Sequence, residues 1–145
     1  MLTLIKSLYR VLKHPQGMLD TSVVIDIALI DDDDLPSEAS ISAVTLAELT
    51  AGPHSTNHVS ERAKRLERLQ WAESTFDAIP FDARAARAYG RIYAAVASTS
   101  RKPRGARAVD LLIAATALSR NLPLYTRNAP DFAGLVDLVD IVAVK

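Results

Sequence analysis

The order of apolar and polar residues along the chain predicts short strands that alternate with helices. Strands are expected at 18–20, 39–44, 76–81, 122–126 and 139–144. Helices are expected from Thr21 or Ser22 onward, over 45–52, 59–75 and 107–120, and from a capping Asp82 to about Ala97. Such alternation is typical of an α/β fold, in which helices flank both faces of a central parallel sheet and make three layers.

Two polar segments and one asparagine mark the predicted turns. The acidic run from Asp31 to Asp34 and the segment "STSRKPRGA" at 98–106 are expected to be loops. Asn121 follows the predicted helix 107–120 and suits the left-handed backbone conformation in which many helices end.

The first 17 residues, "MLTLIKSLYRVLKHPQG", differ from the rest because basic residues divide the apolar ones. Lys6, Arg10 and Lys13 leave no apolar stretch long enough for a signal peptide or a membrane span. A domain that starts with a strand would begin at Met18. We therefore expect residues 1–17 to be a peripheral extension and residues 18–145 to form one domain that does not associate with a membrane.

Composition limits the classes of function that the chain can serve. Its 145 residues are 49% hydrophobic, which is ample for a single packed core. The 17 Lys and Arg residues balance 17 Asp and Glu residues, so no overall basic field attracts nucleic acid. The chain has no cysteine, which excludes disulfides and thiolate metal sites and favours a cytoplasmic location. Any charge-based function must depend on local groups.

Five polar side chains are expected near one edge of the sheet, because each follows a predicted strand or begins a helix that points there. They are Asp20, Glu48, Asp110, Asn128 and Asp131. Structural roles compete with function for most of them. Asp20 is a good helix N-cap, although Thr21 and Ser22 would also serve, and Glu48 can form a capping box with Thr45. Asn128 and Asp131 equally fit the start of a helix.

Asp110 is the most informative of the five. Helical spacing places it on the face that also carries Ile113, Ala114 and Ala117. A carboxylate on an apolar face is costly unless it is paired or bound to a metal. Its place in the first turn adds a dipole interaction of typically under about 1 kcal/mol, which is too little to explain burial. A functional role is therefore favoured.

Basic residues form two groups that indicate a polyanionic partner. Such charges usually form a solvated surface, but their expected convergence near the acids favours phosphate binding. The first group lies on one face of the helix after Asp82, and the second lies in "RKPRGAR" at 101–107. The candidate phosphate-binding residues are Arg84, Arg87, Arg91, Arg104 and Arg107.

Two further features have mainly structural interpretations. His54 and His58 have the spacing of a helical metal pair, but Pro53 and the polar "STN" segment predict a surface loop. Trp71 lies off the apolar stripe of helix 59–75, which suits a protein interface, or it ends the helix and folds inward.

Four segments together resemble the PIN-domain ribonucleases, and most closely the VapC toxins of bacterial toxin–antitoxin modules. They are "MLDTSVVID", "ISAVTLAEL", "ARAVDLLIAATAL" and "LPLYTRNAPDF", and they follow the family's order. The resemblance implies a PIN-like fold whose clustered acids hold Mg²⁺ or Mn²⁺ and hydrolyse RNA. It assigns Asp20, Glu48 and Asp110 to the catalytic, metal-binding core. Many relatives have a fourth acid where this chain has Asn128, so either Asn128 or Asp131 completes the site.

The resemblance also implies partners: a homodimer, an RNA substrate and a cognate antitoxin that holds the enzyme inactive. Elementary chemistry agrees with the metal, because hard divalent ions select carboxylate and amide oxygens. Thr21 or Ser22 would then support Asp20. Two alternatives stay open. One is an aspartyl phosphotransferase of haloacid dehalogenase type, which requires a second acid where this chain has Ser22, and the other is a non-catalytic RNA-binding module.

Overall fold

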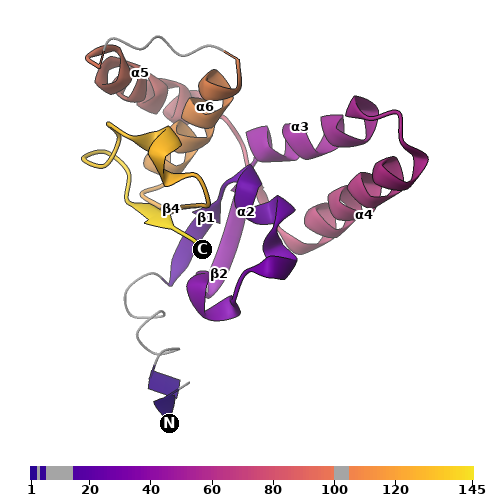
Figure 1. Cartoon of the computed structure of the whole chain (residues 1–145). Helices are drawn as coiled ribbons and strands as arrows, with labels where there is room; N and C mark the ends of the chain where they lie inside the picture. The colour runs from indigo at the N-terminus through magenta and orange to yellow at the C-terminus, as the bar shows by residue number, and fades with distance from the viewer. Residues whose placement is uncertain (3, 6–14, 100–104) are drawn as a thin grey trace.

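Five parallel strands form the centre of the molecule, as seen in a computed structural model that describes residues 1–2, 4–5, 15–99 and 105–145 (Figure 1). The strand order is β3-β2-β1-β4-β5. The strands are β1 (Gln16–Leu19), β2 (Glu38–Ser42), β3 (Ala78–Ile79), β4 (Leu124–Thr126) and β5 (Ile141–Ala143). The helices are α2 (Thr21–Ile25), α3 (Ala43–Ala51), α4 (Val59–Thr75), α5 (Ala83–Ala97) and α6 (Ala106–Ser119).

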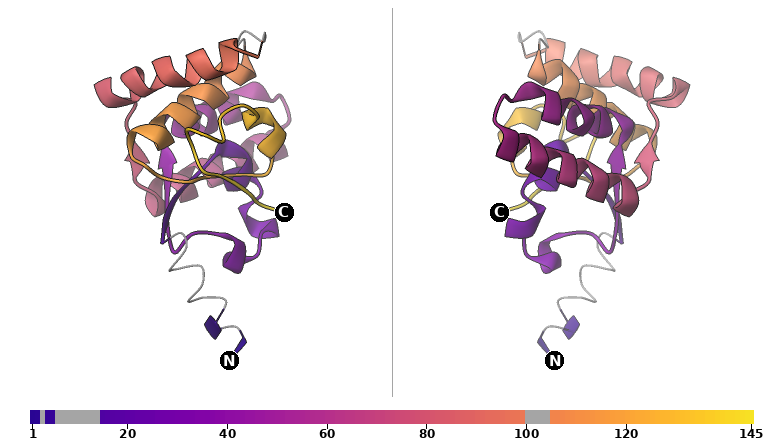
Figure 2. Two further views of the ribbon diagram at one scale, coloured as in Figure 1. Left: turned by 90° about the vertical axis from the view of Figure 1, so that its left-hand side faces the viewer. Right: turned by 90° about the vertical axis from the view of Figure 1, so that its right-hand side faces the viewer.

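Helices cover both faces of the sheet, so the predicted three-layer α/β architecture is confirmed. The α5–α6 pair and the α3–α4 pair lie on different sides of the strands in Figure 1, and the turned views of Figure 2 agree. Short 3-10 turns η1 (Ile27–Leu29), η2 (Asp32–Asp34), η3 (Gly52–Ser55) and η4 (Ala129–Phe132) connect the longer elements. Within the described residues, no helix is both long enough and apolar enough to cross a membrane.

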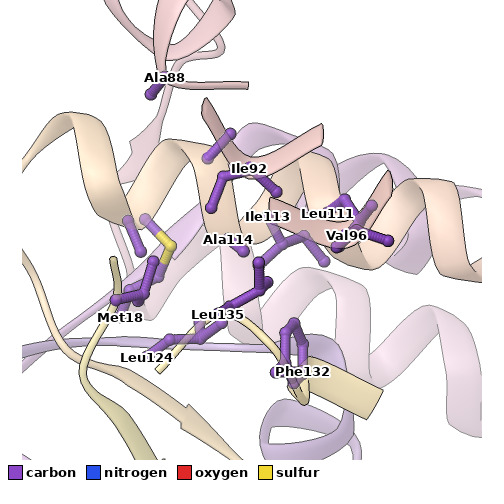
Figure 3. Close-up of a cluster of buried hydrophobic side chains, with 13 residues drawn as sticks. Met18, Ala88, Ile92, Val96, Leu111, Ile113, Ala114, Leu124, Phe132 and Leu135 are labelled. Atoms are coloured by element: carbon purple, nitrogen blue, oxygen red, sulfur yellow. The ribbon is translucent and has the colours of Figure 1, made fainter. Parts of the chain in front are cut away.

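The two faces of the sheet contribute to two separate hydrophobic cores. Successive strand residues point to opposite faces, so Met18 and Leu19 enter different clusters. Met18 and Leu124 pack with residues of α5 and α6, among them Ile92 (Figure 3). Leu19 packs on the other face, with Val23 and further residues of α2, α3 and α4. Because α6 meets neighbours on several sides, its apolar residues surround most of the helix.

Local signals predicted several elements closely. Helix α4 spans the predicted 59–75, and the Asp82 side chain caps α5 by accepting from the Ala85 N–H at 3.0 Å. Asn121 adopts the expected left-handed conformation, with φ of 53°. The predicted acidic loop contains the turn η2, in which the Asp31 side chain accepts from the Asp33 N–H.

Other boundaries differ from the prediction. The helix after β1 ends at Ile25 and is followed by the separate turn η1. Helix α3 begins at Ala43 instead of Thr45, because Ser42 ends β2 and caps the helix. Strand β3 contains only Ala78–Ile79 of the predicted 76–81. The order of the elements along the chain stays as predicted.

The first strand begins before the predicted domain boundary at Met18. Gln16 pairs with Glu38 and Gly17 with Ala39 in the parallel ladder of β1 and β2. Gly17 is needed for close packing, because a Cβ there would lie 2.5 Å from the Tyr125 ring. The structure thus includes Gln16 and Gly17 in the fold. A peripheral role is retained as a prediction only for the residues before them, most of which lie outside the described residues.

Shortening the chain at two positions tests this boundary. We expect a chain that starts at Pro15 to keep the full melting temperature. A chain that starts at Met18 should lose roughly 1–3 kcal/mol of unfolding free energy, because strand hydrogen bonds are worth about 1 kcal/mol each. One of these is the 2.9 Å bond from the Glu38 N–H to the Pro15 carbonyl. Equal melting temperatures for the two chains would show that Pro15, Gln16 and Gly17 contribute nothing.

Candidate metal and nuclease site

Three of the predicted site residues follow two neighbouring strands at their carboxyl ends. Asp20 comes directly after β1, while Asn128 and Asp131 follow β4, which pairs with β1. The chain leaves β1 for β2 on one side, whereas β4 lies on the other side, so this is a topological switch point of the sheet. Ligand sites of open α/β sheets form at such points.

Asp20 is both a helix cap and a buried acid. Asp20 is only 4% exposed. Its Oδ1 accepts from the Val23 N–H at 3.1 Å and from the Ser22 hydroxyl at 2.6 Å. Burial raises the pKa of this carboxyl, although hydrogen bonds from Ser22, Thr126 and Val23 oppose the shift. The capping role therefore does not exclude a functional one.

Ser22 connects the ends of the two strands. Its hydroxyl donates to Asp20 and accepts from the Arg127 N–H at 3.1 Å. Thr126, fully buried at the end of β4, accepts from the Asn128 N–H at 3.0 Å. Sequence analysis predicted support for Asp20 from Thr21 or Ser22 but missed Thr126. The sequence feature that could have indicated Thr126 is a hydroxyl residue at the end of an apolar strand.

Glu48 does not form the capping box that its sequence suggested. The Ser42 hydroxyl accepts from the Thr45 N–H at 2.9 Å and so caps α3. Glu48 instead accepts at Oε1 from the Thr21 hydroxyl at 2.6 Å, and the same Thr21 hydroxyl lies 3.1 Å from that of Thr45. The structural explanation for Glu48 is therefore wrong, and its carboxylate is held toward the end of β1.

Asp110 provides the most direct sign that the acids lie together. It is half-buried in α6, and its pKa is raised from 3.8 to about 6. Burial is the largest cause, followed by the negative charges of Asp131, Glu48 and Asp20, while Arg107 acts in the opposite direction. Groups whose charges act on one carboxyl in this way lie in one region.

The donor chemistry of this region suits a divalent cation. Only oxygen ligands are present in the acidic group, and these are the ligands that Mg²⁺ and Mn²⁺ prefer. In the part of the chain that the structure describes, no three Asp, Glu or His side chains converge closely enough to hold an ion by themselves. Mg²⁺ usually keeps several waters and uses one or two protein carboxylates. The residues therefore fit a hydrated ion better than a closed cage.

Asn128 and Asp131 both follow β4 but differ in charge. Asn128 immediately precedes η4, and Asp131 is an exposed residue within it. Their segment forms a 3-10 turn in place of the helix that sequence analysis allowed. Of the three acids whose charges raise the pKa of Asp110, Asp131 has the largest effect. This favours Asp131 as the group that completes the site.

The three arginines of α5 line one hollow of about 350 Å³ together with Leu118 and Ser119. The Arg84 guanidinium donates to the Ser119 carbonyl at 2.9 Å, at the end of α6, whereas Asp110 lies near its start. Ser119 comes nine positions after Asp110, or about 14 Å along the helix at 1.5 Å per residue. The expected convergence on the acids is therefore wrong for Arg84.

The remaining sequence candidates are placed as follows. Arg107 lies in the first turn of α6 beside Asp110, and Arg104 lies outside the described residues. His54 and His58 are exposed, in agreement with their interpretation as surface residues. Trp71 is 39% exposed and contacts Phe76 edge to face at a ring distance of 5.4 Å, so it is partly covered and partly available.

Comparison with known proteins identifies the family. The PIN domain model matches residues 17–133. Ribonuclease VapC5 of Mycobacterium tuberculosis is 37% identical over 132 residues, covering 89% of this chain and 94% of the relative. Ribonuclease VapC of Rickettsia bellii is 32% identical over 102 residues, covering 70% and 73%. The crystal structure of VapBC-5 from Mycobacterium tuberculosis has a TM-score of 0.78 at 37% identity, covering 90% of this chain and 99% of that one.

The chain therefore belongs to the PIN domain family and, within it, to the VapC ribonucleases. The predicted family and enzyme class are confirmed. PIN ribonucleases are generally metal-dependent. The haloacid dehalogenase alternative is excluded by the family match, and Ser22 at the place of its second acid supports Asp20 instead.

Proposed function

We propose that this chain hydrolyses RNA at the carboxyl edge of the sheet with a bound Mg²⁺ or Mn²⁺. The observation that supports this best is the repulsion that Asp131, Glu48 and Asp20 exert on Asp110, which a divalent cation would relieve. Asp20 and Asp110 are the proposed ligands, and Glu48 and Asp131 bind directly or through water. Asn128 offers an amide oxygen at the same edge.

The roles of the side chains follow from how each is held. When bound, the metal would lower the pKa of a coordinated water and neutralise charge on the scissile phosphate. The bonds from Ser22 and Val23 fix the Asp20 carboxylate, so one oxygen keeps its orientation. The bond from Thr21 restrains Glu48 in the same way. The residues thus supply a preorganised group of negative charges for the cation.

The proposed RNA contacts form two zones at different distances from the acids. Arg107, and by sequence Arg104, belong to the segment next to Asp110. Arg84 would contact a phosphate about 14 Å from Asp110 along α6, which is roughly four nucleotides at the 3.4 Å rise of a stacked strand. Arg87 and Arg91 line the same hollow as Arg84. This separation favours substrates that extend several nucleotides beyond the scissile bond.

We further propose a cognate antitoxin as the protein partner, since the similar crystal structure from Mycobacterium tuberculosis is of a toxin–antitoxin pair. A hollow of about 360 Å³ between α2, α3 and α4 is lined by the apolar residues Ile25 and Leu49 and by the charged residues Glu48, Glu61, Arg65 and Arg68. A peptide segment that carries an apolar residue and a basic residue would contact both kinds of lining and pair with a carboxylate. Trp71 is a second candidate contact. Homodimerisation and a cytoplasmic location are retained as predictions.

Two experiments test these proposals. Total RNA incubated with the purified chain should be cleaved with Mg²⁺ or Mn²⁺ and left intact with a chelator; intact RNA in both reactions would contradict the nuclease proposal and favour an RNA-binding module. The adjacent small gene should encode a protein that co-purifies with the chain and suppresses cleavage. A neighbour that neither binds nor inhibits would contradict the antitoxin proposal.

A further inference from the structure

Arg107 is an arginine whose surroundings the metal site alone does not explain. It lies in α6 three residues before Asp110, so the two side chains share one helix face. The residue is half-buried, and its Nε is buried without a hydrogen-bond partner among the described residues. An unpaired buried donor is costly, so a bound acceptor that pairs with this guanidinium would stabilise the protein.

Several other arginines in the described residues are paired. The Nε of Arg65 lies 3.0 Å from Glu61, and the guanidinium of Arg127 lies 3.1 Å from Asp26. Arg107 forms none of the ion pairs found within the described ranges, although its charge acts on Asp110. It therefore provides a positive, planar donor group beside a group of acids without being paired to one of them.

We propose that Arg107 binds the scissile phosphate of the RNA, with its guanidinium as the donor missing from the acidic group. This inference rests on the proposed function. Carboxylates repel a phosphodiester, so a positively charged donor beside them favours its approach. A guanidinium also binds two phosphate oxygens at once, which a lysine ammonium cannot do in the same geometry. Arg107 thereby orients the phosphate toward the carboxylates.

Kinetics of two Arg107 variants test this role. We expect Arg107→Gln to lower kcat/KM for a defined RNA about 10²-fold, comparable to removal of one donor from a charge-stabilising site. Arg107→Lys should recover only part of the loss, because it restores charge without the planar pair of donors. The matched control is Lys64→Gln, which removes one positive charge from the exposed surface of α4 and should leave kcat/KM unchanged.

A binding measurement separates phosphate contact from charge balance. In the Asp110→Asn background, adding Arg107→Gln should reduce the slope of log affinity against log salt by about 0.7, as for one lost phosphate contact on a single strand. Wild-type kcat/KM in Arg107→Gln, or full recovery in Arg107→Lys together with an unchanged salt slope, would overturn the inference. Absence of metal-dependent cleavage in the wild type would instead refute the proposed function, and the salt slope would then decide the role of Arg107.

Discussion

The Asp110→Asn variant is expected to lose RNA cleavage by about 10³-fold or more while it keeps its affinity for RNA. Asparagine has nearly the same shape but no charge, so it weakens the hold on the cation without removing a large side chain. RNA binding is expected to stay equal or to tighten, because one carboxylate no longer repels the polyanion. Cleavage of labelled RNA and filter binding, measured on the same preparations, check both effects.

The matched variant is Arg87→Gln, which removes a positive charge from the arginines of α5 instead of a negative charge from the acids. It should weaken RNA binding and reduce its salt dependence by about 0.7 of a slope unit while cleavage continues at saturating RNA. The two variants should therefore diverge, one in catalysis and the other in binding. Cleavage by Asp110→Asn at the wild-type rate would show that the acidic core is assigned wrongly.

Metal should stabilise the folded chain in a pH-dependent way. The folded-state pKa of Asp110, about 6, lies above its reference of 3.8, so the folded state holds this proton more tightly than the unfolded state. The resulting contribution to stability is present at low pH and is lost as pH rises from about 4 to 6. At pH 7.5 the metal-free chain then carries the full repulsion among its carboxylates.

Bound Mg²⁺ or Mn²⁺ should offset that repulsion. At 100 times the Kd, binding only to the folded state adds about 2.7 kcal/mol, which corresponds to roughly 5–11 °C in melting temperature for a chain of this size. The rise should be large at pH 7.5 and small at pH 5, where protonated Asp110 binds metal poorly. Asp110→Asn should melt higher than the wild type without metal and gain little from it. A metal-induced rise equal in both proteins would contradict this site.

Short-range signals explain why much of the fold was predictable. The Asp82 cap, the left-handed Asn121 and the limits of α4 all depend on residues within a few positions of one another. The order of strands and helices follows from the same kind of pattern. The start of β1 was harder to predict, because Gln16 and Gly17 are polar or small and join the sheet only through pairing with β2.

Glu48 shows why local motifs can mislead at a functional site. The "TLAE" segment satisfies the capping-box pattern, but Ser42, three residues earlier, already caps the Thr45 N–H. The actual partner of Glu48 is Thr21, which is 27 residues away in the sequence. A single sequence does not show such a contact, since it depends on how α2 and α3 meet.

The arginines illustrate the same limit for charges. Sequence spacing placed Arg84, Arg87 and Arg91 on one helix face, and they do line one hollow. Their distance from Asp110 depends on the packing of α5 against α6, which sequence spacing does not define. Arg107 differs because it shares a helix with Asp110, so its proximity was predictable from the helical repeat.

The central claim, that one cation binds between these carboxylates, is tested most directly by anomalous diffraction from crystals grown with Mn²⁺. We expect a Mn²⁺ peak at roughly 2–2.5 Å from oxygens of Asp20 and Asp110, with Glu48 and Asp131 bound directly or through water. The same crystals of Asp110→Asn should show a weak peak or none. A Mn²⁺ ion that binds elsewhere, under conditions in which the wild type cleaves RNA, would show that these carboxylates are not the metal site.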